Sequence, residues 1–183
     1  SPIAQALGDD FQNLHAAVRR HYAAPTHDIR GTMDVVYVKS AIKPLALVSY
    51  KLLGAPVPYS GRDVETIVRN RIDDSGAMHW VRNFIQNASF PEAITFGSRM
   101  VWSGDGRIIE FTRYGVGVES DMTVDGSGSL VYDVRRYVVS VPFLGLIVRV
   151  PTWLTPFGGG RTKEIGETEE SFRVEFEMVH PIF

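Results

Sequence analysis

The stretch SFRVEFEM, residues 171–178, carries the pattern that decides the fold class of this chain. Aromatic and aliphatic residues occupy every second position from Phe172 onward, and arginine or glutamate lies between them. A β-strand turns successive side chains to opposite faces of a sheet. The segment is therefore expected to form a strand with one apolar face and one solvated face.

Outward from this segment, strand-like segments with the same period follow one another from Gly61 onward. They are separated by short turns at residues 73–76, 103–106 and 125–128, whose aspartate and glycine residues supply the positive φ angles of hairpins. Strands joined by short turns pair antiparallel, and a long antiparallel sheet curls or closes. We expect one domain over residues 1–183, an α+β and mainly β fold. Its centre would be a curved antiparallel sheet or β-barrel of about seven to nine strands.

The first third of the chain predicts two helices that cover this sheet. After Asp10, a residue suited to capping, apolar residues recur at helical spacing up to Tyr22. A second helix is expected from Ala41 to Leu53, with Gly54 as its stop.

Composition excludes several classes of protein. The chain has 183 residues, a formal net charge of −2 and no cysteine. Disulfide scaffolds, thiol nucleophiles and thiolate zinc sites are therefore excluded, and a nucleic-acid binder would need a more basic surface. The longest apolar stretch, Val138 to Val150, is interrupted by Pro142, Gly145 and Arg149 and is too short for a membrane span. No signal-peptide pattern is present, and we expect a cytoplasmic protein.

Motifs for cofactors and metals are absent. The sequence has no phosphate-binding loop with lysine, no HExxH, no GxSxG elbow and no EF-hand loop. The acidic run from Glu164 to Glu170 lacks the spacing of a calcium loop, and we expect it to lie in a solvated loop and strand entry. No cofactor and no metal site are expected.

The informative residues are charged side chains that share a strand face with bulky apolar ones. Arg82, Glu110 and Arg136 are the three candidates, and His180 continues the apolar series of the last strand. A buried unpaired charge costs several kcal/mol, so such side chains must pair with each other, with water or with a ligand. The aromatic residues expected to line the same interior are Trp80, Phe84, Phe96, Trp102, Tyr114, Tyr132, Phe172 and Phe176.

This arrangement predicts the binding of a hydrophobic small molecule, such as a lipid, an isoprenoid or a polyketide-like compound, in a barrel-like cavity. Arg82, Glu110 and Arg136 would orient its polar head. The first alternative is a cofactor-independent isomerase, cyclase or hydrolase, with Glu110 as general base and Arg82 as the group that stabilises negative charge. The second is an interaction module that docks through the loop Ala55–Tyr59 or through Trp153 and Leu154. The oligomeric state is left open.

Short motifs along nearly the whole chain resemble the bacterial domain of unknown function 4166. They are LG at residues 7–8, HDIRG at 27–31, LLGAP at 52–56, GR at 61–62, WVRNF at 80–84, PFLG at 142–145, VPTWLTP at 150–156, ESFRVEF at 170–176 and HP at 180–181. The resemblance implies no catalytic residue. Similar domains occur alone or attached to nicotinamide-dependent oxidoreductase-like or membrane segments, which suggests small-molecule or lipid metabolism and a partner oxidoreductase.

Overall fold

Ten strands form one antiparallel sheet in the computed structural model, which describes residues 1–35, 43–54, 57, 59–155 and 158–179. The strands are β1 (Thr26–Val35), β2 (Gly61–Ile72), β3 (Met78–Phe84), β4 (Ile94–Gly104), β5 (Arg107–Phe111), β6 (Val116–Val124), β7 (Leu130–Val141), β8 (Leu146–Pro151), β9 (Gly159–Gly166) and β10 (Phe172–Val179).

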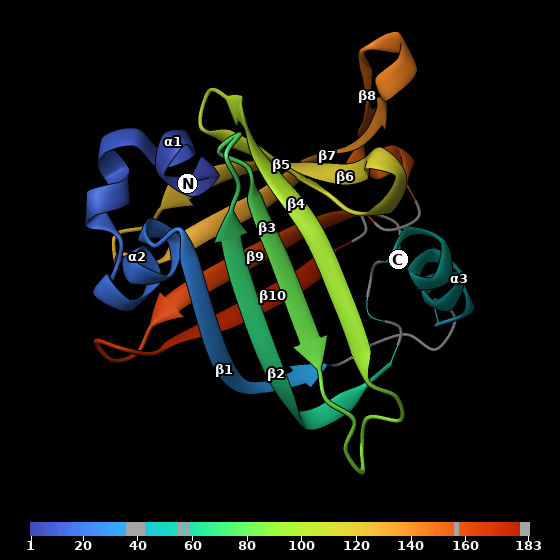
Figure 1. Ribbon diagram of the computed structural model, residues 1–183, viewed down its shortest axis with the longest axis horizontal. Coiled ribbons are helices and arrows are strands. Elements are labelled where there is room, and N and C mark those ends of the chain that lie inside the picture. The colour runs from blue at the N-terminus through green and yellow to red at the C-terminus, as the bar shows by residue number, and fades with distance from the viewer. Residues whose placement is uncertain (36–42, 55–56, 58, 156–157, 180–183) are drawn as a thin grey trace.

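The sheet is a meander whose path contains nine strands. β1 to β7 pair in sequence order, β9 pairs with the first half of β7, and β10 pairs with β9. β8 lies off this path and pairs with the second half of β7. Figure 1 shows the sheet curled into a half-barrel, with the β7–β8 hairpin projecting from it. The expected mainly β fold with a curved antiparallel sheet is confirmed.

Helices at the N-terminus lie against one end of the half-barrel. They are α1 (Pro2–Leu7), the 3-10 helix η1 (Gly8–Asn13) and α2 (Ala16–Ala23). The expected single helix from Asp10 to Tyr22 is interrupted because Leu14 is extended and His15 starts a new helix, its Nδ1 accepting a hydrogen bond from the Ala17 amide at 3.4 Å.

A third α-helix, α3 (Lys43–Leu53), lies beside the other end of the sheet (Figure 1). It matches the expected helix, whose first two residues lie outside the described part of the chain. Among the described residues, three further short 3-10 segments lie between strands: η3 (Arg113–Gly115), η4 (Pro142–Leu144) and η5 (Thr152–Leu154). No helix among the described residues is long and apolar enough to cross a membrane.

Two apolar clusters lie on the concave face of the half-barrel, one toward each end. The first packs the N-terminal helices, through Ile3, Val18 and others, against the sheet and includes Trp80. The second includes Phe84 and Phe90. Because Trp80 and Phe84 lie four residues apart on β3, the inward residue between them, Arg82, lies between the two apolar clusters.

We expect Gly117→Ala to lower the free energy of unfolding by about 1–3 kcal/mol, as overpacking does. Gly117 pairs with Phe111, and a Cβ atom there would lie 2.3 Å from the Glu110 carbonyl oxygen. The matched control is Gly97→Ala in β4, where an added Cβ meets no atom within 4 Å. Urea unfolding of both variants tests this, and equal midpoints would contradict it.

Candidate functional site

The cross-strand register places three polar side chains, those of Arg82, Ser98 and Glu110, near one another on the concave face. Arg82 of β3 lies opposite Phe96 of β4, and Ser98 lies opposite Trp80. Glu110 of β5 lies opposite Met100, and cross-strand partners share a face of the sheet. The sequence-based expectation that Arg82 and Glu110 share a face with apolar residues is therefore met in the structure.

Arg82 is held between aromatic rings and a carboxylate. Its Cζ lies 3.7 Å from the centroid of the Trp80 ring and 4.9 Å from that of Phe96. Its Nη1 lies 3.4 Å from Glu110 Oε1, an oxygen that also accepts a hydrogen bond from the Ser98 hydroxyl at 2.5 Å. The two charged side chains remain 17% and 20% exposed, so the ion pair is partly buried.

A buried carboxyl group lies in the same interior, on β9. Glu164 is fully buried, and its Oε1 contacts the Tyr22 hydroxyl at 2.6 Å and the Tyr132 hydroxyl at 3.1 Å. The two hydroxyls lie 2.6 Å apart. Burial raises the pKa of Glu164 to about 7, against the smaller opposing effects of the two tyrosine hydrogen bonds and of Arg82. Among the described residues, Glu164 Oε2 has no hydrogen-bond partner.

A neutral histidine completes the polar layer. His21 is buried, and its Nε2 lies 2.8 Å from the Asn70 amide nitrogen. Burial lowers the pKa of His21 to about 3, with additional lowering by the charges of His27 and Arg82. The neutral ring therefore accepts a hydrogen bond from Asn70 at Nε2 and carries its own proton on Nδ1, which has no partner in the described part of the chain.

Apolar side chains at the rim of the concave face are open to solvent. Val174 and Phe176 of β10 share the face of Glu164 and Thr162, and they are 43% and 61% exposed. The Phe176 ring passes over Gly160, where a Cβ atom would lie 3.4 Å from it. β10 is the last strand of the sheet path and β1 is the first, so this rim lies along an edge of the half-barrel.

Two surface hollows among the described residues lie away from this polar layer. One, of about 340 Å³, is lined by residues of η1 and α2, such as Phe11 and Arg20. The other, of about 180 Å³, is lined by Gln5, Arg99 and Trp102 among others. Within the described residues, no group of three or more histidine, aspartate or glutamate side chains is placed to hold a metal ion.

The aromatic residues expected in the interior divide into three groups. Trp80, Phe84, Phe96, Tyr132 and Phe172 are buried or half-buried in the concave face. Phe176 lies at its exposed rim, and Trp102 is 49% exposed beside α1. The placement of Tyr114 in the interior is wrong. The chain leaves the strand at η3, where Tyr114 has a φ of 59° and is 81% exposed.

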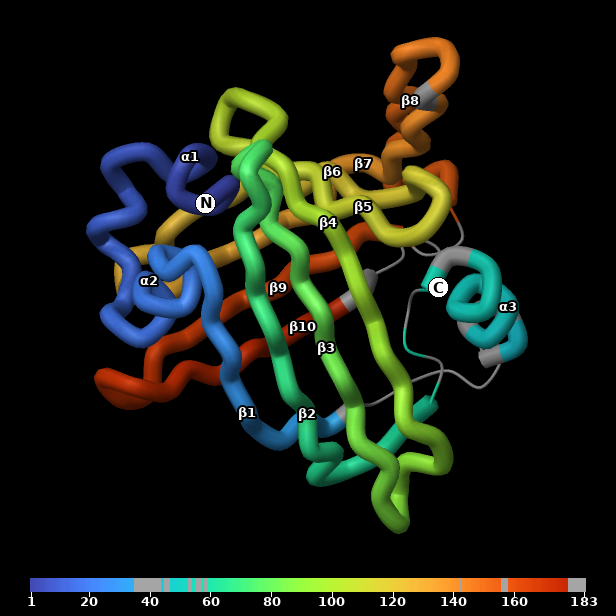
Figure 2. The backbone as a smooth tube through the Cα atoms, in the orientation of Figure 1, coloured from blue at the N-terminus to red at the C-terminus, as the bar shows by residue number. Residues whose placement is uncertain are grey.

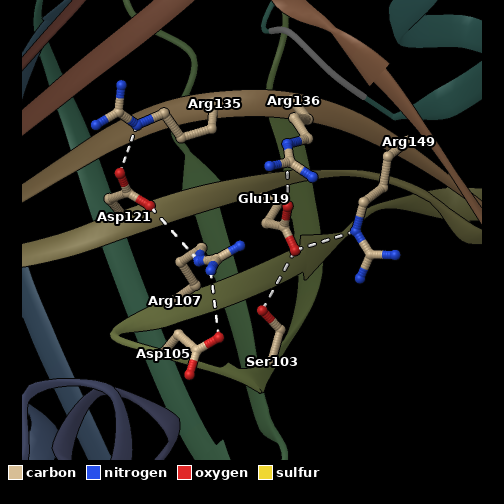
Figure 3. A network of polar contacts seen from close by, with 8 residues as sticks. All are labelled: Ser103, Asp105, Arg107, Glu119, Asp121, Arg135, Arg136 and Arg149. Atoms are coloured by element: carbon tan, nitrogen blue, oxygen red, sulfur yellow. Dashed lines mark hydrogen bonds and ion pairs between the residues drawn. The ribbon is translucent and has the colours of Figure 1, made fainter.

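The expectation that Arg136 faces the interior is also wrong, because a β-bulge interrupts the alternation. Ser120 pairs with Val134, but the preceding Glu119 pairs with Arg136. The extra residue turns Arg136 to the convex face, where its Nε lies 3.7 Å from Glu119 Oε2. Figure 3 shows Arg136 and Arg149 converging on this one carboxylate, with Arg149 Nε at 3.3 Å. His180 lies outside the described residues.

Sequence reasoning missed the buried members of the polar layer. Glu164 was expected in a solvated loop and strand entry, and this is wrong: it is an inward residue of β9. Its signal is weak because glycines precede the strand and polar residues occupy both of its faces. His21 and Asn70 carry no motif, and only the docking of α2 onto β2 brings them together.

Comparison with known families gives one finding. The model of a family described as Domain of unknown function (DUF4166) matches residues 14–183. No curated protein and no solved structure matches the chain.

Glu164→Gln should change how stability depends on pH. The native pKa of about 7 exceeds the ordinary 4.5, so the native state holds more protons than the unfolded state between these values. Wild-type stability from this group is present below about pH 4.5 and is lost as the pH rises through 7. Relative to the wild type, the glutamine variant should therefore gain up to about 3 kcal/mol over this range.

Denaturant unfolding at a series of pH values measures this difference, and Glu175→Gln is the control. Glu175 lies on the opposite face of its strand and is exposed, so its variant should follow the wild-type curve. Parallel stability curves for the wild type and Glu164→Gln would show that the buried carboxyl group does not titrate as described.

Proposed function

This chain belongs to the DUF4166 family, and we propose that it binds a hydrophobic small molecule on the concave face of the half-barrel, with the polar head at Arg82 and Glu110. The supporting observation is the position of Arg82, half-buried between two apolar clusters and stacked on Trp80. A curled antiparallel sheet is a common frame for such sites.

The apolar part of the ligand would cover the exposed rim. Phe176 and Val174 are 61% and 43% exposed on the face where a folded chain normally has its core. Removing such surface from water contributes about 25 cal/mol per Å². A lipid, isoprenoid or polyketide-like molecule lying along β10 would gain this free energy at both residues.

Charge balance in the interior favours a neutral polar head. Arg82 and Glu110 form an ion pair whose charges cancel. Burial keeps His21 neutral, and it also favours the uncharged form of Glu164. A carboxylate or phosphate head would bring an unbalanced charge into this layer, which is costly in a low-dielectric interior. A hydroxyl or carbonyl head can instead accept a hydrogen bond from Arg82, and a hydroxyl can also donate to Glu110.

The contacts of Glu110 favour binding over the enzyme alternative. A general base works best with a pKa near the operating pH, which a fixed cation beside a carboxylate opposes. Glu110 Oε1 already faces the Arg82 guanidinium and accepts the Ser98 hydroxyl. Neither contact makes the carboxylate a stronger base. We therefore assign Glu110 the role of orienting the polar head of the ligand.

The test uses native mass spectrometry of the protein purified from its own host, followed by titration with a long-chain alcohol and the matching fatty acid. We expect a co-purified apolar species that is lost in Arg82→Ala. The matched control is Arg69→Ala, which removes an arginine from the convex face of the neighbouring strand, where it pairs with Asp28 at 3.5 Å. Retention of the species in Arg82→Ala would contradict the assigned head-group site.

Phe176→Ser offers a second variant that does not disturb the core, because the ring is 61% exposed. It should weaken binding of the alcohol about tenfold, the effect of losing partial burial of one aromatic ring. Glu175→Ser, on the opposite face of the same strand, should leave the affinity unchanged. Tighter binding of the fatty acid than of the alcohol would contradict the neutral-head assignment.

A further inference from the structure

The β7–β8 hairpin carries an apolar surface that stays exposed among the described residues. Its tip is η4, followed by Gly145 with a φ of 61° and then by β8. Figures 1 and 2 show the hairpin projecting away from the half-barrel. Phe143 is 86% exposed and Leu144 is 65% exposed. Along β8 the residues Leu146, Ile147 and Val148 are all exposed, although they alternate between the two faces of the strand.

Other exposed apolar residues lie near this hairpin. Trp153 and Leu154, in η5 directly after β8, are 63% and 59% exposed. Tyr114 of η3 is 81% exposed, and its neighbour Gly115 packs so closely on β7 that a Cβ atom there would lie 3.0 Å from the Ser140 carbonyl oxygen. We call the hairpin tip, η3 and η5 together the hairpin end.

α3 lies next to η3. Gly54, which follows the helix, lies against the Arg113 side chain, with the position of an added Cβ 3.2 Å from Arg113 Nε. Val48 and Leu52 of α3 are 53% and 60% exposed. The helix contains two lysines and no acidic residue. Such a large set of exposed apolar side chains marks an interaction surface.

The charged residues of the hairpin indicate a partner with a negatively charged surface. The hairpin, residues 134–151, contains Arg135, Arg136 and Arg149 and no acidic residue. Arg135 pairs with Asp121 of β6. At the base of the hairpin, Arg136 and Arg149 share the single buried carboxylate of Glu119, which leaves an excess of positive charge. This uncompensated positive charge beside an apolar tip complements an anionic lipid surface.

The order of residue types along the hairpin also fits a membrane. Residues 137–148, which contain the tip, have no charged side chain. Arg149 follows them, and the amphipathic ring of Trp153 comes next. An apolar tip followed by arginine and tryptophan combines residue types that contact the acyl chains, the phosphates and the interfacial zone of a bilayer.

The shape of the tip distinguishes a membrane from a protein partner. A protein partner would need a matching hollow for a convex apolar tip, whereas a fluid bilayer adapts to it. We propose that the hairpin end binds the surface of an anionic membrane, with Phe143 and Leu144 inserted to the acyl boundary. This interaction is independent of the ligand proposed for the concave face.

Vesicle flotation of the full chain tests the proposal. We expect binding to vesicles of equal parts phosphatidylcholine and phosphatidylglycerol, weaker binding to phosphatidylcholine alone, and release by salt. The double variant Phe143→Ser, Leu144→Ser should reduce partitioning at least about tenfold, because both side chains lose apolar burial in the bilayer. Its fold is kept because both side chains are exposed.

The matched control is Ile85→Ser, which removes an exposed apolar residue outside the hairpin end, directly after β3. It should bind vesicles like the wild type. Tryptophan fluorescence should shift to the blue on vesicle binding, and Trp153→Phe should abolish the shift. Equal flotation of the double variant and the wild type would overturn the proposal. The proposal would also be overturned if the wild type formed a dimer that the double variant disrupts and did not bind vesicles.

Discussion

The hydrogen-bonded contact of Glu164 with Tyr22 and Tyr132 joins the three parts on which the interior depends. Tyr22 comes from α2, Tyr132 from β7 and Glu164 from β9, so the contact links the N-terminal helices to two strands that curl around them. None of these three groups can form its hydrogen bonds with solvent instead, because all three side chains are buried. A buried polar network is stable only when its members are paired, and this requirement fixes the position of the helices against the sheet.

The requirement that buried polar groups be paired also explains why the concave face is apolar at its ends and polar in the middle. The N-terminal helices cover one end with apolar side chains, and a second apolar cluster fills the other. Arg82 and Glu110 lie between them and compensate each other, while Trp80 stacks on the guanidinium. An interior of this kind keeps its net charge near zero, which is the physical basis for proposing a ligand with a neutral polar head.

Much of the fold follows from the sequence, because a two-residue period and short glycine-containing turns specify antiparallel hairpins locally. The inward orientation of Arg82 and Glu110 follows from that period alone, since no irregularity interrupts β3 and β5 near them. Arg136 shows the limit of such reasoning. One extra residue in β7 turns its side chain to the convex face, and no sequence signal marks this bulge. The pairing of His21 with Asn70, 49 residues apart, depends on tertiary docking that periodicity does not contain.

The central claim is that the concave face, at Arg82, is the place where an apolar ligand binds. The most direct measurement is a ¹H–¹⁵N spectrum of the side-chain Nε–H groups of arginine and tryptophan during titration with a long-chain alcohol. The account predicts that the Arg82 and Trp80 signals shift together and saturate, while Trp153 on the hairpin end does not respond. Shifts at Trp153 with unchanged Arg82 and Trp80 signals would contradict it.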